Sequence, residues 1–161
     1  MSGPRPQIIT KDLRDIEAED LAGFDAIAHL AELSNDPLGQ QNPGLTHEIN
    51  HAGSLRLAQL AEKAGVKRFV YMSSCSVYGV GQPDQILDET SPINPQTAYA
   101  ECKAKVERDV GAMADDSFEP CFLRNATAWR GLQRKSNYFP TDPPGGPWSM
   151  HLICARPSCY L

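Results

Sequence analysis

The chain has 161 residues and a net charge of −5, with 41% apolar and 22% charged residues. This size and composition suit one domain with a hydrophobic core. Because no basic cluster occurs that could neutralise a row of phosphates, nucleic acid is not expected as a partner. The longest apolar stretches have the length of a strand, and the first residues lack the apolar centre of a signal peptide. We therefore expect no membrane partner and a cytoplasmic location.

Cysteine and histidine do not form a recognisable metal or disulfide pattern. The five cysteines are scattered and odd in number, and no C-x-x-C occurs, which argues against disulfides and zinc. His151, Cys154 and Cys159 are possible soft ligands, but a fourth ligand is missing, so no metal is expected. His29 lies in an apolar run, where a core or loop histidine is the more frequent case.

Three apolar runs are predicted to be buried strands. They cover residues 24–31 (FDAIAHLA), 68–73 (RFVYMS) and 120–124 (PCFLR). Each run is short and continuous, a pattern typical of strands that are covered on both faces of a parallel sheet. Before them, only the stretch QIIT at residues 7–10 resembles a strand.

Helical patterns separate these runs. Residues 45–64 carry apolar side chains at helical spacing and end at Gly65, a typical residue after a helix. A second helix is predicted from about Thr97, with its apolar stripe at Ala98, Cys102, Val106, Val110 and Met113. Strand–helix–strand–helix–strand order with crossovers of this length predicts right-handed βαβ units, a parallel sheet and an α/β fold.

Tyr99 and Lys103 lie four residues apart on the second predicted helix, so they share one face of it. A lysine ammonium favours the phenolate and lowers the pKa of a nearby tyrosine, which can then accept a proton from a substrate hydroxyl. Ser74, at the end of the second strand, could hold the substrate oxygen by a hydrogen bond. The alternative is structural: Lys103 pairs with an acid such as Glu107, Tyr99 packs on the sheet and Ser74 caps a turn.

Polar residues follow all three predicted strands, in the stretches HLAELS, SSCSVYG and NAT. Ligands of parallel α/β sheets bind at the carboxyl ends of the strands. These residues are also common caps and turn formers. Their grouping opposite one helix with a Tyr–Lys pair is nevertheless a stronger signal for a site than any one stretch alone.

These stretches carry a family resemblance. GVKRFVYMSSCSVYG followed by DETSPINPQTAYAECKAKVE strongly resembles the extended short-chain dehydrogenase/reductases, specifically the NAD-dependent epimerase/dehydratase family. DLRD, FDAIAHLAELSNDP, EINHAGSLRLAQLA and FLRNATA match in the same order, so the resemblance covers about residues 8–130. It implies an NAD- or NADP-binding Rossmann fold and a nucleotide-sugar substrate.

The resemblance also implies roles for individual residues. Tyr99 matches the acid/base, Lys103 its electrostatic and ribose-binding partner, and Ser74 the third catalytic position. Ser76 and Thr127 match positions near the substrate. The positions that match the family's cofactor contacts are Asp12, Leu13, Leu30, Ala31, Asn50, Ser73, Asn125 and Ala126, together with Tyr99 and Lys103.

The chain also departs from the family pattern. It contains no G-x-G-x-x-G or G-x-x-G-x-x-G stretch, so the first βαβ unit with its phosphate-binding turn is expected to be missing. We accordingly expect a partial Rossmann domain over residues 1–131, truncated at both ends. An irregular or disordered segment is expected over residues 132–161, since it is rich in Pro and Gly. Glu32 stands where the family often has a small residue and is expected to be a surface charge.

An incomplete sheet would leave the strand at residues 24–31 with an open edge, which predicts marginal stability or a homodimer. Two functions remain open. The first is an NAD-dependent nucleotide-sugar epimerase/dehydratase that works through Tyr99, Lys103 and Ser74, with NADP not excluded. The second is a catalytically silent family fragment that acts at most as an interaction module.

Overall fold

The computed structural model describes residues 10–34, 41–81, 87–125 and 153–155. Within them, one sheet has the strand order β3–β2–β1–β4. Its strands are β1 (Ala26–His29), β2 (Arg68–Ser74), β3 (Glu119–Asn125) and β4 (Ile153–Ala155). β1, β2 and β3 are parallel and are joined by helical crossovers, which confirms the predicted α/β class. The stretch at residues 7–9 lies outside the described residues.

β1 ends before β2 and β3 at the carboxyl edge of the sheet, which leaves one corner of the sheet incomplete. β1 pairs with β2 only as far as His29 beside Tyr71. β2 continues to pair with β3 until Ser74 lies beside Asn125. The first strand is thus shorter than the predicted run of residues 24–31. As a result, no strand among the described residues lies beside the last residues of β2 on the β1 side.

The crossover between β1 and β2 is helical, as predicted, but its winding changes along its length. It consists of α2 (Pro43–Thr46), the π-helical segment η3 (His47–Gly53) and α3 (Ser54–Lys63). Gly65 follows with φ of 77°, a conformation that glycine adopts without steric cost, and ends the helix as predicted. Periodicity of apolar residues does not distinguish α from π winding, so the η3 segment could not be predicted from the sequence. π-helical segments are rare in proteins, and those that occur are often found at functional sites.

The crossover between β2 and β3 contains α4 (Ala98–Gly111). Thr97 is its N-cap, and the Thr97 hydroxyl accepts a hydrogen bond from the Ala100 amide at 3.2 Å. This cap places Tyr99 in the first turn of the helix and Lys103 one turn further on. Three short 3₁₀ segments complete the described helices: η1 (Leu13–Asp15), η2 (Ala18–Leu21) and η4 (Cys75–Tyr78).

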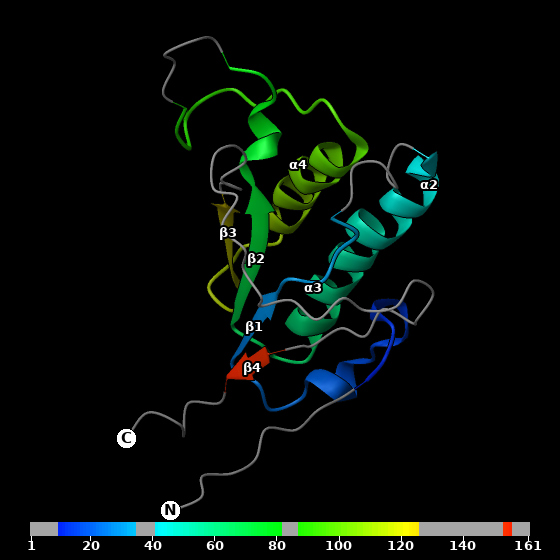
Figure 1. Ribbon diagram of the computed structural model, residues 1–161. Coiled ribbons are helices and arrows are strands. Elements are labelled where there is room, and N and C mark those ends of the chain that lie inside the picture. Colours follow the sequence, from blue (N-terminus) through cyan, green and yellow to red (C-terminus); the bar gives the residue numbers. More distant parts are fainter. Residues whose placement is uncertain (1–9, 35–40, 82–86, 126–152, 156–161) are drawn as a thin grey trace, which may run out of the picture.

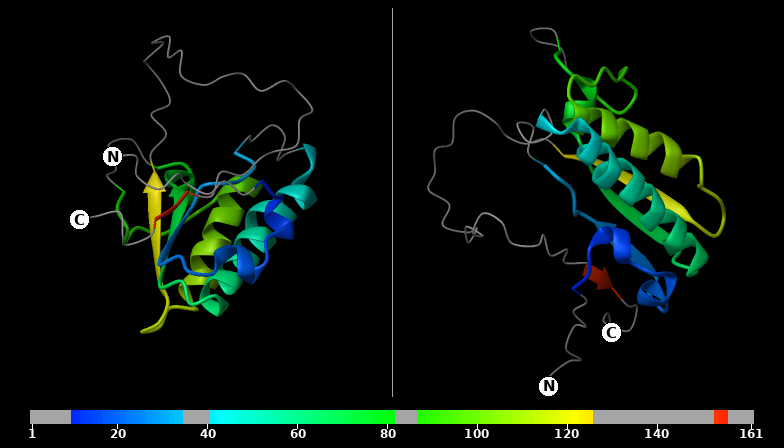
Figure 2. Two further views of the ribbon diagram at one scale, coloured as in Figure 1. Left: turned by 90° about the horizontal axis from the view of Figure 1, so that it is seen from below. Right: turned by 90° about the vertical axis from the view of Figure 1, so that its right-hand side faces the viewer.

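Both long helices, α3 and α4, cover the same face of the sheet (Figures 1 and 2). Burial alternates along β1 and β2, with Ile27, Phe69 and Tyr71 fully buried on the helix side. On the other face, Leu123 is 45% exposed. The expectation that the strands are covered on both faces is therefore wrong for the described residues, because their helices lie on one face only.

β4 lies antiparallel to β1, with Ala26 beside Ala155 and Ala28 beside Ile153. The three residues of β4 belong to residues 132–161, which were expected to be irregular, so that expectation is wrong for them. β4 also supplies the backbone partner that the edge of β1 was expected to lack. The remainder of residues 132–161 lies outside the described residues. In the described part of the chain, no helix is long and apolar enough to cross a membrane.

Candidate active site

A small cavity of about 150 Å³ lies at the corner where β1 ends before β2. Three residues that the sequence singled out line it: Tyr99 and Lys103 from α4, and Ser74 from the end of β2. Its full lining is Leu30, Glu32, Ser34, Met72, Ser73, Ser74, Tyr99, Lys103 and Asn125. The structure thus brings the Tyr–Lys pair and the polar strand ends to one place.

Lys103 is the most constrained of these residues. Its side chain is 5% exposed, and its Nζ lies 2.6 Å from Oε2 of Glu32. Nζ also donates to the Met72 carbonyl, in the part of β2 that extends beyond β1. The ammonium lies 4.5 Å from the centre of the Tyr71 ring and 5.3 Å from that of Tyr99. The lysine is therefore held between two aromatic rings, a carbonyl and a carboxylate.

The expectation that Glu32 is a surface charge is wrong. Its side chain is only 4% exposed, and it accepts a hydrogen bond from the Tyr71 hydroxyl in addition to its ion pair with Lys103. The sequence contained a signal for this arrangement, because Glu32 directly follows an apolar run. Tyr71 also occupies an inward position of β2, two residues after Phe69, but its hydroxyl partner could not be inferred from spacing.

Asn50 explains why Glu32 points inward. Its side chain is fully buried in η3 and forms two hydrogen bonds to Leu33, the residue after Glu32. Asn50 Oδ1 accepts from the Leu33 amide at 2.8 Å, and Asn50 Nδ2 donates to the Leu33 carbonyl at 3.0 Å. Through these two hydrogen bonds, η3 holds the backbone of the loop that follows β1.

Burial and charge act in opposite directions on these groups. Burial lowers the pKa of Lys103, and the Glu32 carboxylate opposes that shift. Burial raises the pKa of Glu32, against the effect of Lys103. The pKa of Tyr71 is raised far above its usual value by burial and by the adjacent Glu32 charge. Tyr71 therefore stays protonated and serves as a hydrogen-bond donor.

A second ion pair involves Glu107, one turn after Lys103 on α4. Glu107 forms a two-oxygen contact with Arg124 of β3, with Nη2 at 2.7 Å from Oε2, and accepts from Ser73 Oγ at 2.5 Å. Arg124 also donates to the Tyr78 hydroxyl at 2.9 Å. Glu107 thus pairs with Arg124 and not with Lys103. The structural alternative, in which Lys103 pairs with an acid and Ser74 caps a turn, is confirmed in these two respects, but the acid is Glu32.

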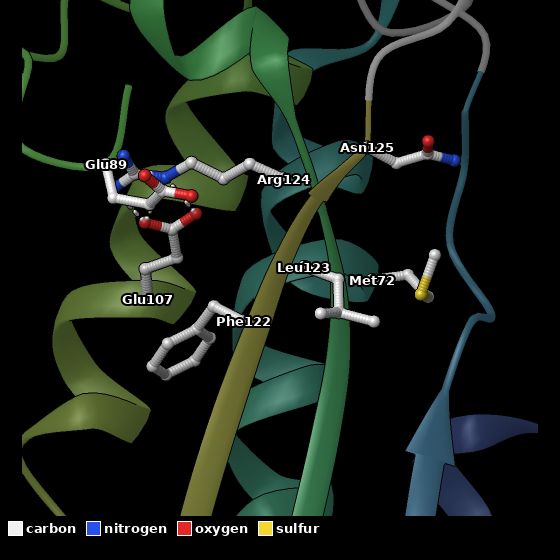
Figure 3. A pocket seen from close by; sticks show the side chains of 7 residues that line it. All are labelled: Met72, Glu89, Glu107, Phe122, Leu123, Arg124 and Asn125. Carbon is white, nitrogen blue, oxygen red and sulfur yellow. Dashed lines mark hydrogen bonds and ion pairs between the residues drawn. The ribbon is translucent and has the colours of Figure 1, made fainter.

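This second pair borders a larger hollow of about 550 Å³. Figure 3 shows Arg124, Glu107 and Phe122 on one side of β3, with Leu123 and Met72 on the other. The hollow thus passes around the β3 side of the sheet and is not lined by the Tyr–Lys pair. It is adjacent to the smaller cavity, because Asn125 and Met72 line both.

Other predicted site residues are placed as follows. Ser74 is 6% exposed, caps η4, and accepts a hydrogen bond from the Ser76 amide at 3.2 Å. The buried Ser76 hydroxyl has no hydrogen-bond partner among the described residues. Leu30 is 56% exposed at the mouth of the cavity.

The structure does not bring the remaining predicted cofactor residues to the cavity. Asp12 caps η1 and binds Arg14, and Leu13 belongs to the hydrophobic core. Ala31 packs against that core, and Asn50 is occupied by Leu33. Ala126 and Thr127 were also predicted site residues and lie outside the described residues.

Among the described residues, no group of three or more His, Cys, Asp or Glu side chains could hold a metal ion. His29 is a core residue, as predicted: it is 1% exposed, and its Nε2 lies 2.7 Å from Ser54 Oγ. Burial and the nearby Lys103 charge lower the pKa of His29 to about 3, so it is neutral at physiological pH. The side chains of three possible soft ligands, His151, Cys154 and Cys159, lie outside the described residues.

The parallel sheet with helical crossovers and a Tyr–Lys–Ser cavity at its carboxyl edge defines a Rossmann-like protein of the short-chain dehydrogenase/reductase type. A sequence model of the NAD dependent epimerase/dehydratase family matches residues 4–129. The chain belongs to this family.

Individual relatives agree with the assignment. A UDP-glucose 4-epimerase from Lactobacillus helveticus is 32% identical over 108 residues, which is 67% of this chain and 30% of that protein. A dTDP-glucose 4,6-dehydratase from Streptomyces venezuelae with NAD bound has a TM-score of 0.66 at 32% identity, over 71% of this chain and 36% of that one. A UDP-N-acetylglucosamine 4-epimerase from Methanobrevibacter ruminantium has a TM-score of 0.65 at 28% identity, over 71% and 37%. The chain thus corresponds to about a third of the length of these relatives.

Proposed function

We propose that this chain carries the catalytic half of an NAD-dependent epimerase/dehydratase site for a nucleotide sugar. The observation that supports it best is the single cavity lined by Ser74, Tyr99 and Lys103. These groups suit the chemistry, since a phenol can carry a proton, an ammonium can bind hydroxyls, and a serine can hold the reacting oxygen.

The donors around the cavity also suit a nicotinamide nucleoside. Lys103 offers N–H donors for ribose hydroxyls, and Asn125 offers an amide at the mouth. When bound, NAD would accept a hydride from the sugar and later return it. Glu32 does not fit this role of Lys103, because its carboxylate already pairs with the ammonium that would bind the ribose.

The protein's own part in the reaction is proton transfer and orientation. Tyr99 would take the proton from the sugar hydroxyl and later give it back, assisted by the positive charge of Lys103. Ser74 would hold that hydroxyl in line with Tyr99. The cavity at present limits this chemistry, because its volume of about 150 Å³ is smaller than the roughly 300 Å³ of typical ligand pockets.

The test is a calorimetric titration of NAD, followed by an assay for conversion of UDP-glucose and dTDP-glucose. We expect binding in the micromolar range, and we expect Tyr99→Phe to abolish conversion while NAD still binds. Tyr78→Phe is the matched control, since it removes a hydroxyl from a neighbouring residue that does not line the cavity. Absence of binding at millimolar NAD would overturn the proposal for this chain.

A second candidate function is an interaction module without catalysis. The observation that favours it is the Glu32–Lys103 pair, which neutralises the catalytic lysine within the chain itself. This function predicts no NAD binding in the wild-type protein, so the same titration decides between the two.

A further inference from the structure

Glu32 carries a charge in the cavity wall, and no proposed step uses that charge. It is a buried carboxylate in contact with a residue that must bind the cofactor. Burying a charge is costly unless it is paired, so the arrangement is maintained by specific contacts. Its role therefore needs an explanation beyond packing.

We propose that Glu32 is an internal competitor for Lys103: its carboxylate takes the place of ligand hydroxyls on the ammonium and keeps the site closed until it is displaced. This inference rests on the proposed function, since it concerns access to the same lysine. Three geometric observations support it.

First, Glu32 reaches Lys103 inside the cavity. The ion pair at 2.6 Å lies among groups that line the same space, and both side chains are about 95% buried. A ribose hydroxyl that binds Nζ therefore competes with the Glu32 oxygen for the three N–H donors of the ammonium. Nζ is also committed to the Met72 carbonyl, which leaves few directions from which a ligand can approach.

Second, two separate contacts hold Glu32 in this position. The Tyr71 hydroxyl donates to its other oxygen, and Asn50 fixes the backbone of the next residue, Leu33. A carboxylate that is held before the ligand arrives loses little conformational entropy when it pairs with Lys103. Displacement by a neutral hydroxyl is correspondingly difficult.

Third, the pair reduces the effect of Lys103 on Tyr99. The ammonium is 5.3 Å from the Tyr99 ring, and a carboxylate directly beside it cancels much of its field at that distance. Glu32 therefore weakens both functions of Lys103: binding of hydroxyls and activation of the tyrosine. Departure of Glu32 would free the N–H donors of Lys103 and, since Glu32 opposes the effect of burial, would also lower the pKa of the lysine.

The direct test measures the accessibility of Lys103 rather than activity. Wild type, Glu32→Gln and the control Glu101→Gln are acylated with N-hydroxysuccinimide acetate at pH 8, and the rate at Lys103 is followed by mass spectrometry. Glu101 is on the same helix with its side chain 49% exposed, so its replacement removes the same charge without touching Lys103. We expect Glu32→Gln to be acylated at least about tenfold faster, because an unpaired buried ammonium deprotonates more readily.

NAD titration of the same three proteins is the second measurement. We expect Glu32→Gln to bind NAD about tenfold more tightly than wild type and Glu101→Gln to bind like wild type. If Glu32→Gln does not fold, Glu32→Asp replaces it, since the shorter side chain retracts from Lys103 while keeping its charge. Equal acylation rates in wild type and the folded variant would overturn the inference.

The two proposals fail differently. If Lys103 becomes reactive in the variant but neither protein binds NAD, the proposed function fails and the restraint by Glu32 stands. If wild type binds NAD in the micromolar range and the variant binds it no tighter, the internal competitor is refuted and the proposed function stands.

Discussion

Two ion pairs involve residues one turn apart on α4, and they differ in burial and in the elements that they join. Lys103 pairs with Glu32 at exposures of 5% and 4%, whereas Arg124 pairs with Glu107 at 20% and 10%. The first pair lines the cavity with Tyr99, and the second joins α4 to β3. Lys103 and Glu107 have the spacing of a helical ion pair, yet each selects a partner outside the helix. Burial and position thus separate the first pair, which lies in the cavity wall, from the second, which links a helix to a strand.

The largest effect is expected from breaking the buried pair. Lys103→Met leaves the Glu32 carboxylate unpaired, which should lower the free energy of unfolding by about 3–5 kcal/mol. The triple variant Lys103→Met, Glu32→Met, Tyr71→Phe replaces all three polar partners by apolar groups and should recover most of the loss. Urea denaturation measures both. A triple variant as unstable as the single one would show that the loss comes from packing rather than from an unpaired charge.

A pH effect is expected from His29, which belongs to the same buried region. Its pKa is about 3 in the folded protein, because of burial and Lys103, and about 6.5 when unfolded. Protons therefore bind the unfolded state preferentially below pH 6.5, so this contribution to stability falls as pH falls towards 3. The slope is at most about 1.4 kcal/mol per pH unit, or about 2–3 kcal/mol between pH 6.5 and 4.5.

Comparison of wild type with His29→Gln isolates this contribution. The raised pKa of Glu32 acts with the opposite sign near pH 4.5, and it cancels in the difference between the two proteins. The acidic groups Asp12 and Asp109 have pKa values of about 2, so they titrate below this window. Parallel stability curves for the two proteins would contradict the assignment of His29 as a buried neutral residue.

The less deeply buried pair, Arg124 with Glu107, should matter less. Arg124→Met removes the contacts with Glu107 and Tyr78 and should cost about 1–2 kcal/mol, since both groups can still reach water. Arg68→Met is the control, because Arg68 is 68% exposed and should change stability by less than about 0.5 kcal/mol. A loss as large as that of Lys103→Met would remove the distinction between the two regions.

The contrast also shows how far the sequence led. The order of apolar runs predicted the parallel strands, and Thr97 and Gly65 predicted helix ends, because these signals are local. Motif spacing identified Tyr99, Lys103 and Ser74, which line one cavity. The apolar run before Glu32 was a signal for its burial, but its partners could not be inferred, because they come from β2 and α4, which are distant in the sequence. Exposure of one sheet face and the pairing of β4 with β1 are likewise non-local, so strand-length patterns could not reveal them.

The smallest effect is expected at Thr97, and it separates Tyr99 from Lys103. Thr97→Ala removes the cap to the Ala100 amide and should cost about 1 kcal/mol, whereas Thr97→Ser should restore it. Fraying is confined to the first turn, which contains Tyr99, while Lys103 is held by Glu32 and Met72. Hydrogen exchange should therefore accelerate at Ala100 and remain unchanged at Lys103. Equal acceleration at both amides would mean that the buried pair does not anchor the helix independently of its cap.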